Sequence, residues 1–244
     1  MICVRGSGSA TLQIVRNAKK NGKYVISFLD DDLLNIPDNI SCTDYYQDKI
    51  IQRNIKDILK HSDVLWVVNT KIGEKYSQYC SNWVLEKIPA NIEYGNDSIL
   101  KGSLVKFLYA GSKDHEQNVR KYLIPAVRRI CSDYEGSVEF SFVGVNSGIE
   151  NMSNVKNYVY FKDYNYYREF IQKEQFQYGL AVIETTDFYQ AKYYNKYIEY
   201  GSLGIVGIYT KSMPYVAIVR DTINGYLTEN NEEAWYKSIK KVFL

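Results

Sequence analysis

The sequence has 244 residues, of which 45% are hydrophobic and 24% charged, as in globular proteins that bury a core. The formal net charge of +2 gives no excess of basic residues that would indicate binding to nucleic acid. No apolar run approaches the about 18 residues of a membrane span, and the first residues do not form a signal peptide. We therefore expect a cytoplasmic protein, free or peripheral at the inner face of the membrane.

The first half of the chain alternates short apolar runs with amphipathic segments. Runs rich in β-branched and aromatic residues predict strands at residues 2–6, 23–29, 63–69 and within 83–94. Amphipathic stretches predict helices at residues 9–22 and 46–62. This order is typical of βαβ units and a parallel sheet.

Residues 92–103 are polar, contain two glycines and have no clear period, which indicates a linker. Beyond it the alternation restarts. Strands are predicted at 104–111, 137–145, 158–164, 178–184 and 205–210, and helices at 114–134, 166–175, 189–204 and 231–243. Pro125 predicts a kink or break in the first of these helices.

We therefore predict an α/β protein with two Rossmann-like parallel-sheet domains that face a cleft. Residues 1–95 would form the first domain and residues 96–244 the second. A cleft between such domains is the default place for a ligand.

The stretch from Thr185 to Thr210 carries the most chemistry. If residues 189–204 form one helix, Lys192, Lys196 and Glu199 stand at i, i+4 and i+7 and share a face. The N-terminus of such a helix and its lysines favour a phosphate, and the glutamate could accept hydrogen bonds from a ribose. The alternative is a solvated face of charged residues with an i, i+3 ion pair.

This region resembles the C-terminal half of GT-B glycosyltransferases, above all the retaining, nucleotide-sugar-dependent enzymes of family 4. The matching positions keep the family's order and are Lys192, Lys196, Glu199, Gly204, Asn224, Gly225 and Trp235. The resemblance covers roughly residues 104 to 243, and more weakly residues 22 to 92.

Two departures from the family stand out. The family usually carries two glutamates separated by seven residues; Glu199 fits the second, but the first falls at Ala191. That first carboxylate helps to hold the donor sugar, for which Asp187, Thr186 and Gln190 are the candidates here. The family's early βα units also do not precede Met1, so the N-terminal domain looks incomplete.

The resemblance implies a retaining hexosyltransferase that moves a sugar from a nucleotide diphosphate to a glycan or glycoconjugate. It places Asp187, Lys192 and Lys196 in catalytic roles, and Glu199 at the nucleotide ribose. The remaining donor contacts would come from Gly111, Ser112, Lys113, Phe161, Tyr164, Thr186 and Gln190. Gly144 joins them because it ends a predicted strand, where backbone can approach a ligand. No cofactor is expected, since the nucleotide-sugar is a substrate.

Asp30, Asp31 and Asp32 follow a predicted strand and raise the question of a metal site. In the GT-A architecture an Asp-x-Asp pair holds Mn²⁺ or Mg²⁺, and Asp30 with Asp32 has that spacing. Acceptor contacts, or a plain loop with a helix N-cap, are the alternatives. If lysines and a helix N-terminus neutralise the diphosphate, no metal is needed. We therefore place the aspartates on the acceptor side and expect no metal.

Three hypotheses follow from the sequence. The first is a GT-B-like, metal-independent transferase. The second is a truncated, non-catalytic subunit that binds a nucleotide-sugar and works with another chain. The third is a GT-A metal enzyme. An open sheet edge in the incomplete domain also predicts self-association or a partner chain that supplies the missing elements.

Overall fold

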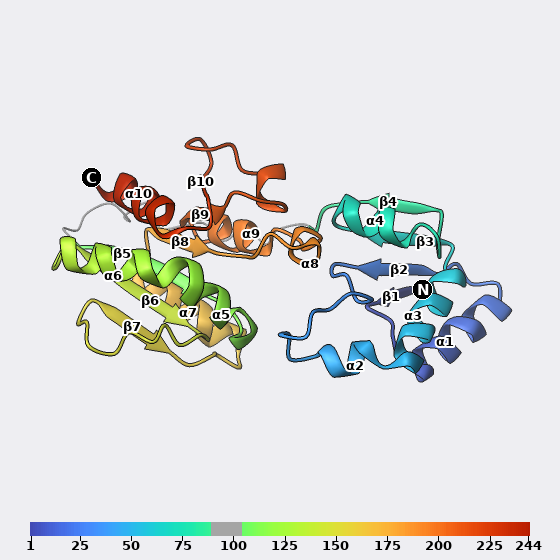
Figure 1. Ribbon diagram of the computed structural model, residues 1–244. Coiled ribbons are helices and arrows are strands. Elements are labelled where there is room, and N and C mark those ends of the chain that lie inside the picture. The colour runs from blue at the N-terminus through green and yellow to red at the C-terminus, as the bar shows by residue number, and fades with distance from the viewer. Residues whose placement is uncertain (89–103) are drawn as a thin grey trace. The chain divides into compact units, whose positions relative to one another are not determined.

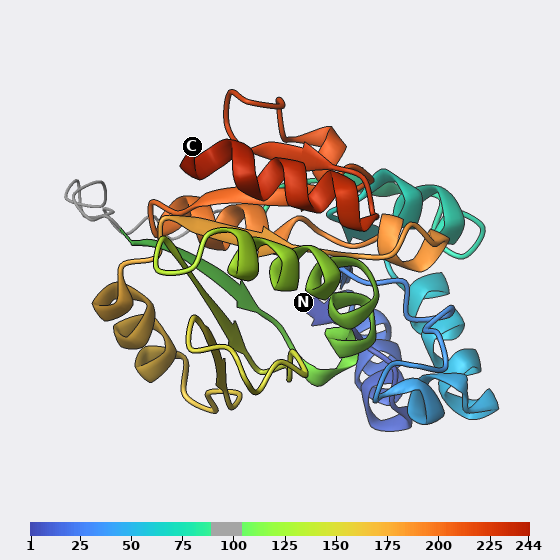
Figure 2. The same ribbon diagram turned by 60° about the vertical axis from the view of Figure 1, so that its left-hand side comes forward.

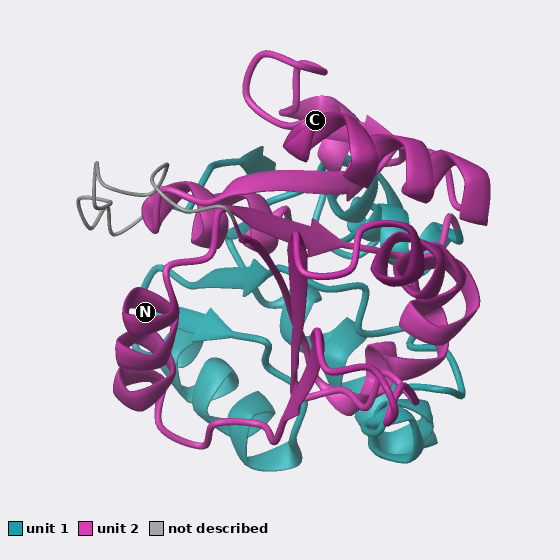
Figure 3. Ribbon diagram, turned by 90° about the vertical axis from the view of Figure 1, so that its left-hand side faces the viewer, with its two compact units in different colours: residues 1–89, 186–193 teal, residues 90–185, 194–244 magenta. Residues whose placement is uncertain are grey.

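The computed structural model describes residues 1–88 and 104–244. The chain divides into two compact units, which are coloured separately in Figure 3. The first contains Met1–Pro89 and Thr186–Tyr193, and the second contains Ala90–Thr185 and Tyr194–Leu244. The predicted linker and the predicted boundary at residue 95 lie outside the described residues.

The first unit contains a four-stranded parallel sheet (Figure 1). Its strands follow the chain in the order β1-β2-β3-β4, and they are β1 (Ile2–Val4), β2 (Ile26–Leu29), β3 (Val64–Val67) and β4 (Trp83–Leu85). The helices of this unit are α1 (Ser9–Lys20), α2 (Thr43–Gln47), α3 (Lys49–Lys60), α4 (Thr70–Tyr76) and α8 (Asp187–Gln190). The predicted strands and the helices at α1 and α3 are confirmed, whereas α2 and α4 were not predicted.

The second unit contains a six-stranded parallel sheet. In the order β10-β9-β8-β5-β6-β7, its strands are β10 (Tyr226–Thr228), β9 (Val206–Thr210), β8 (Tyr178–Ala181), β5 (Val105–Ala110), β6 (Val138–Val143) and β7 (Val155–Tyr158). The chain first builds outward from β5 to β7 and then returns to place β8 on the other side of β5. The strand order therefore reverses between β5 and β8, and ligands of open α/β sheets bind outside the carboxyl ends of the strands at such a point.

Helices cover both faces of this second sheet. They are η1 (Lys113–His115), α5 (Glu116–Asn118), η2 (Val119–Leu123), α6 (Ile124–Asp133), α7 (Tyr164–Glu174), α9 (Asn195–Ser202), η3 (Tyr215–Ala217) and α10 (Glu232–Phe243). Helices α6 and α10 lie side by side on one face (Figure 2). They cover a core that includes the stacked rings of Phe107 and Phe140 and the fully buried Trp235. On the other face Tyr200 of α9 packs directly onto Gly179 of β8.

Several helices begin where a side chain caps their free backbone N–H groups. The capping residues are Asp48 of α3, Asn69 of α4, Asp163 of α7 and Asn231 of α10. Among the described residues, no helix has both the length and the apolar composition needed to cross a membrane.

The helix predicted at 114–134 is present, and its predicted break near Pro125 is confirmed, because the π-helical turn η2 ends at Leu123 and α6 starts with Pro125 in its first turn. Three other predictions are wrong. The strand predicted at 158–164 lies earlier, at β7. Strand β10 was not predicted at all.

The third error matters most for function, because residues 189–204 do not form one helix. Helix α8 ends at Gln190 and α9 begins at Asn195. The side-chain amide of Asn69 donates to the carbonyl oxygens of Gln190 (2.9 Å) and Lys192 (3.0 Å). A continuous helix would need those two oxygens for its own i+4 N–H groups. Asn69 therefore stabilises the break.

We predict that Asn69→Ala lowers the free energy of unfolding by about 2 to 3 kcal/mol, because it removes both hydrogen bonds and the cap of α4. Urea denaturation would measure the loss. Asn69→Asp keeps the capping oxygen and should lose less, and Asn21→Ala, at an exposed asparagine, should change little. Equal stability of Asn69→Ala and the unchanged protein would contradict this role of Asn69.

Candidate functional site

The carboxyl ends of β5 and β6 bring two glycine loops into contact. Gly111 follows β5 and donates its N–H to the carbonyl oxygen of Val143 (3.0 Å). Gly144 follows β6 with a φ of +77°, and a Cβ there would lie 2.2 Å from the carbonyl oxygen of Gly111. Only glycine fits position 144, so the two loops can pack backbone against backbone here.

The loop after β5 adds polar groups to this edge. Ser112 is extended and immediately precedes η1, which contains Lys113. Both side chains are exposed. The structure thus gathers Gly111, Ser112, Lys113 and Gly144 at the carboxyl edge next to the reversal of strand order, as a phosphate-binding role requires.

Glu199 of α9 is held by two donors. Its Oε1 accepts a hydrogen bond from the Tyr167 hydroxyl of α7 (2.5 Å), and its Oε2 accepts one from the Lys196 ammonium (2.6 Å). The Glu199 side chain is only 18% exposed. Burial raises the pKa of the Tyr167 hydroxyl well above its usual range, and the Glu199 carboxylate raises it further. Tyr167 therefore remains a hydrogen-bond donor, and the Glu199 carboxylate keeps a fixed orientation.

A second asparagine fixes the loop beside α9. Asn224 donates through its amide to the Tyr197 hydroxyl (3.1 Å) and to the carbonyl oxygen of Ile218 (3.1 Å), while its own oxygen accepts from the N–H of Arg220 (2.7 Å). The next residue, Gly225, has a φ of +154°. Asn224 and Gly225 are two of the positions on which the family resemblance rests. The hydrogen bond from Asn224 to Tyr197 places them next to α9, the helix that carries Glu199.

Two aromatic residues predicted to contact the donor lie at the start of α7. Phe161 precedes the helix, and Tyr164 is its first residue. Phe161 packs against Phe170 and Tyr167, at ring distances of 5.2 and 6.0 Å. Tyr164 is 63% exposed and lies 6.0 Å from Tyr167. Tyr160 was not predicted; it is 66% exposed, and its ring lies against Gly144. Tyrosine is so frequent in this sequence that its pattern could not single out Tyr160.

The expectation that Lys192, Lys196 and Glu199 share one helix face is wrong. Lys192 lies in the break between α8 and α9 and forms an ion pair with Asp31 (3.1 Å) in the first unit. Lys196 and Glu199 alone remain on one helix, as the i, i+3 pair of the alternative interpretation. The catalytic role of Lys192 remains a prediction, but it cannot rest on a shared face.

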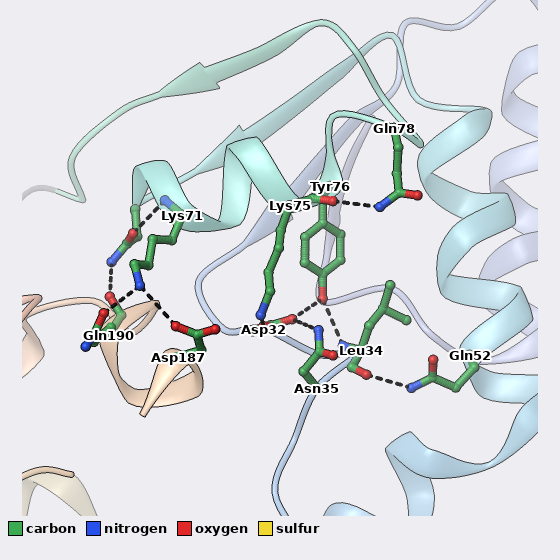
Figure 4. A network of polar contacts seen from close by, with 11 residues as sticks. Asp32, Leu34, Asn35, Gln52, Lys71, Lys75, Tyr76, Gln78, Asp187 and Gln190 are labelled. Carbon is green, nitrogen blue, oxygen red and sulfur yellow. Dashed lines mark hydrogen bonds and ion pairs between the residues drawn. The ribbon is translucent and has the colours of Figure 1, made fainter. Parts of the chain in front are cut away.

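The other predicted sugar contacts also belong to the first unit. Asp187 and Gln190 of α8, together with Thr186, are part of its segment Thr186–Tyr193. The ammonium of Lys71 in α4 donates to the side chains of both Gln190 (2.5 Å) and Asp187 (3.3 Å) (Figure 4). Asp187 nevertheless keeps a side chain that is 81% exposed, so it can accept further hydrogen bonds.

Helix α4 also contacts Asp32, through Lys75 and Tyr76 (Figure 4). Lys71, Glu74, Lys75 and Asp187 line an open pocket in this unit. Lys75 forms an ion pair with Asp32, which is fully buried and also accepts from the Tyr76 hydroxyl (2.8 Å). Sequence reasoning missed Lys71 and Lys75, although Asn69 after a predicted strand is an N-cap signal that could have revealed α4.

All three aspartates are paired with cationic side chains. The guanidinium of Arg5 binds both oxygens of Asp30, at 2.5 and 2.6 Å, and lies 3.6 Å from Asp31. In residues 1–88 and 104–244, no group of three His, Cys, Asp or Glu side chains could hold a metal ion. The carboxylate of Asp32 is fully buried and accepts a hydrogen bond from the side-chain amide of Asn35 (2.8 Å), so it orders its own loop. The acceptor-side role stays a prediction for the accessible pair, Asp30 and Asp31.

Comparison with known proteins identifies the fold. No family model and no curated protein matches the chain. Solved structures do match, among them TarM, with a TM-score of 0.70 at 14% identity over 100% of this chain and 47% of that one. The pneumococcal O-GlcNAc transferase GtfA, in complex with UDP and GlcNAc, matches with a TM-score of 0.63 at 13% identity, over 99% and 48%.

A third match is the lipopolysaccharide outer core galactosyltransferase WaaB, with a TM-score of 0.59 at 14% identity, over 99% of this chain and 66% of that one. The chain thus spans from about half to two thirds of the length of these three proteins. The predicted α/β architecture with two parallel sheets is confirmed, and the chain has a GT-B glycosyltransferase fold.

Proposed function

We propose that the protein is a GT-B glycosyltransferase that takes a sugar from a nucleotide diphosphate donor and transfers it, with retention, to a glycan or glycoconjugate. The observation that carries this proposal is the Glu199 carboxylate, which Tyr167 and Lys196 hold in a fixed orientation in the second unit. A fixed and partly buried carboxylate suits the two hydroxyls of a ribose, because both can donate to it.

The donor phosphates are assigned to the loop after β5 and to the start of α9. Gly111 and Gly144 bring the two loops together at this edge, and Lys113 supplies an exposed positive charge. Lys196 lies in the first turn of α9, where the helix dipole adds to its charge. These groups would stabilise the negative charge that develops on the departing diphosphate.

The donor sugar is assigned to the exposed carboxylate of Asp187 and the amide of Gln190. Lys71 holds both side chains in place through its ammonium. Asp187 and Gln190 would take the place of the glutamate that the family carries at the position of Ala191. Asp30 and Asp31 are kept as acceptor contacts.

We predict that Glu199→Ala weakens nucleotide binding about 10- to 150-fold, the equivalent of losing a charged hydrogen bond worth about 1.5 to 3 kcal/mol. Tyr167→Phe should weaken it about 2- to 10-fold, because it frees the carboxylate without removing it. Thermal-shift screening with UDP, GDP, ADP and CMP, followed by titration calorimetry with the best of them, measures both effects.

Glu174→Gln is the matched control, since Glu174 forms a lysine–glutamate pair with Lys106 at 22% exposure, near the amino end of β5. It should bind the nucleotide like the unchanged protein. If Glu199→Ala and Glu174→Gln bind equally well, the Glu199 site is not the donor site.

We further predict that nucleotide affinity and transfer rate are the same in EDTA as in Mg²⁺ or Mn²⁺, because Asp30, Asp31 and Asp32 are each already paired with a lysine or arginine. Titration with and without EDTA tests this. Metal-dependent binding that disappears in Asp30→Ala would instead favour the GT-A hypothesis.

The second candidate is a non-catalytic subunit that binds a nucleotide-sugar and works with another chain. Such a subunit binds the nucleotide but shows no turnover with a UDP-sugar on its own. Turnover by the isolated chain, lost in Lys196→Ala, would exclude it.

A further inference from the structure

Helices α1 and α3 of the first unit form one layer whose charge is almost entirely positive. The two helices pack side by side, joined by the hydrogen bond from the Asn54 amide to Ser9 Oγ (3.1 Å) and the ion pair of Arg16 with Asp57 (3.5 Å). Together they contain seven lysines and arginines and one acidic residue, Asp57, which gives a net charge of +6. The whole chain has a net charge of only +2, so its other residues together are net negative. Positive charge is therefore concentrated on this layer.

The cations of α3 form a single stripe on the side of the helix that faces away from the core. The buried side of α3 consists of Asn54, Ile55, Ile58 and Leu59. At about 100° per residue, the opposite side falls on the four cations of the helix, which lie within an arc of about 60°. These are Lys49, Arg53, Lys56 and Lys60. No acidic residue interrupts the stripe, because Asp57 lies beside it and is bound to Arg16 of α1.

The protein itself does not neutralise these cations. The four of the stripe, and two more at the end of α1 and just after it, form no ion pair with any residue that the structure describes. Lys56 lies over the ring of Tyr79 (5.9 Å), whereas Lys19 of α1 does have an acidic partner, Asp63 (2.6 Å). A solvated helix surface normally mixes both signs, often as i,i+4 pairs. We call the six cations the basic face: Lys20, Lys23, Lys49, Arg53, Lys56 and Lys60.

Two isoleucines are exposed on the same two helices. Ile50 is 53% exposed and directly follows Lys49, and Ile14 on α1 is 58% exposed. An exposed isoleucine is ordinary by itself, but here both accompany unpaired cations. A lipid surface can satisfy both kinds of side chain, with headgroups for the charges and the acyl boundary for the isoleucines. A nucleic acid would satisfy only the charges, because its phosphates offer nothing to an isoleucine.

We propose that the basic face is a membrane-binding surface that adsorbs to bilayers containing anionic lipids. Charge complementarity and the two isoleucines select this partner, and clusters of about four to eight lysines and arginines on a helix are typical of such surfaces. The stripe on α3 extends about 17 Å along the helix axis, so its charges meet a plane of headgroups rather than a single anion. Binding is mainly electrostatic and therefore reversible. This proposal does not rest on the proposed enzymatic function.

Co-sedimentation of the whole chain with sucrose-loaded vesicles tests the proposal. Vesicles of equal parts phosphatidylglycerol and phosphatidylcholine should bind the chain in about 0.1 M NaCl, and vesicles of phosphatidylcholine alone should not. Binding should be lost as the salt rises to about 1 M, because the Debye length falls from about 10 to about 3 Å. Arg53→Gln combined with Lys60→Gln should weaken binding about 25-fold, or about fivefold for each charge removed.

Lys237→Gln combined with Lys241→Gln is the matched control, because both are exposed lysines of α10 in the second unit and their loss changes the net charge equally. This variant should bind anionic vesicles like the unchanged chain. Ile50→Gln keeps every charge and should weaken vesicle binding about two- to fivefold. A DNA duplex serves as the competing polyanion, and the chain should bind it more weakly than the anionic vesicles.

Three results would overturn the proposal. The first is no binding to anionic vesicles at low salt, and the second is an equal loss of binding in the two double variants. The third is tighter binding to the duplex together with no effect of Ile50→Gln on vesicle binding, which would indicate a nucleic-acid surface instead. Circular dichroism would show that the variants are folded. If Arg53→Gln with Lys60→Gln is unfolded, Lys49→Gln with Lys56→Gln replaces it, with the same expectation.

Discussion

A parallel strand can be joined to its neighbour only by a connection that crosses a face of the sheet, and this constraint organises both units. In the second unit the strand order reverses between β5 and β8, so helices lie on both faces and two loop sets diverge at the reversal. The glycines after β5 and β6 stand at that edge. In the first unit no step reverses, and α1, α3 and α4 lie on one face of the sheet. The glycine loops of the second unit and the one-sided packing of these three helices are two results of one topological rule.

The side chain of Asn69 decides where the helices between Thr186 and Ser202 end and begin. By binding the carbonyl oxygens of Gln190 and Lys192, it keeps α8 and α9 apart and holds the segment Thr186–Tyr193 in the first unit. The candidate residues between Thr185 and Thr210 are therefore divided between the two units. Asp187 and Gln190 follow the first unit through Lys71, while Lys196 and Glu199 follow the second through Tyr167.

Much of the fold could be predicted from local pattern, because β-branched runs and amphipathic segments depend on near neighbours. The break at Lys192 could not, since it depends on Asn69, a residue more than a hundred positions away. Helix propensity alone favours continuing through Ala191. For the same reason the sequence correctly predicted Lys196 and Glu199 as a pair on one helix but wrongly added Lys192, and it could not reveal Tyr167 as the residue that holds Glu199.

The three aspartates show why an acidic motif alone is weak evidence for a metal. A carboxylate cluster binds a cation when its charge is not otherwise compensated. Here Arg5 binds Asp30 through two hydrogen bonds, Lys192 pairs with Asp31, and Lys75 pairs with the buried Asp32. The three cationic side chains come from different parts of the chain. The sequence around the three aspartates therefore does not reveal that their charges are compensated. To bind there, Mn²⁺ or Mg²⁺ would have to displace these ion pairs, one of them fully desolvated at the carboxylate, and leave its lysine without a partner.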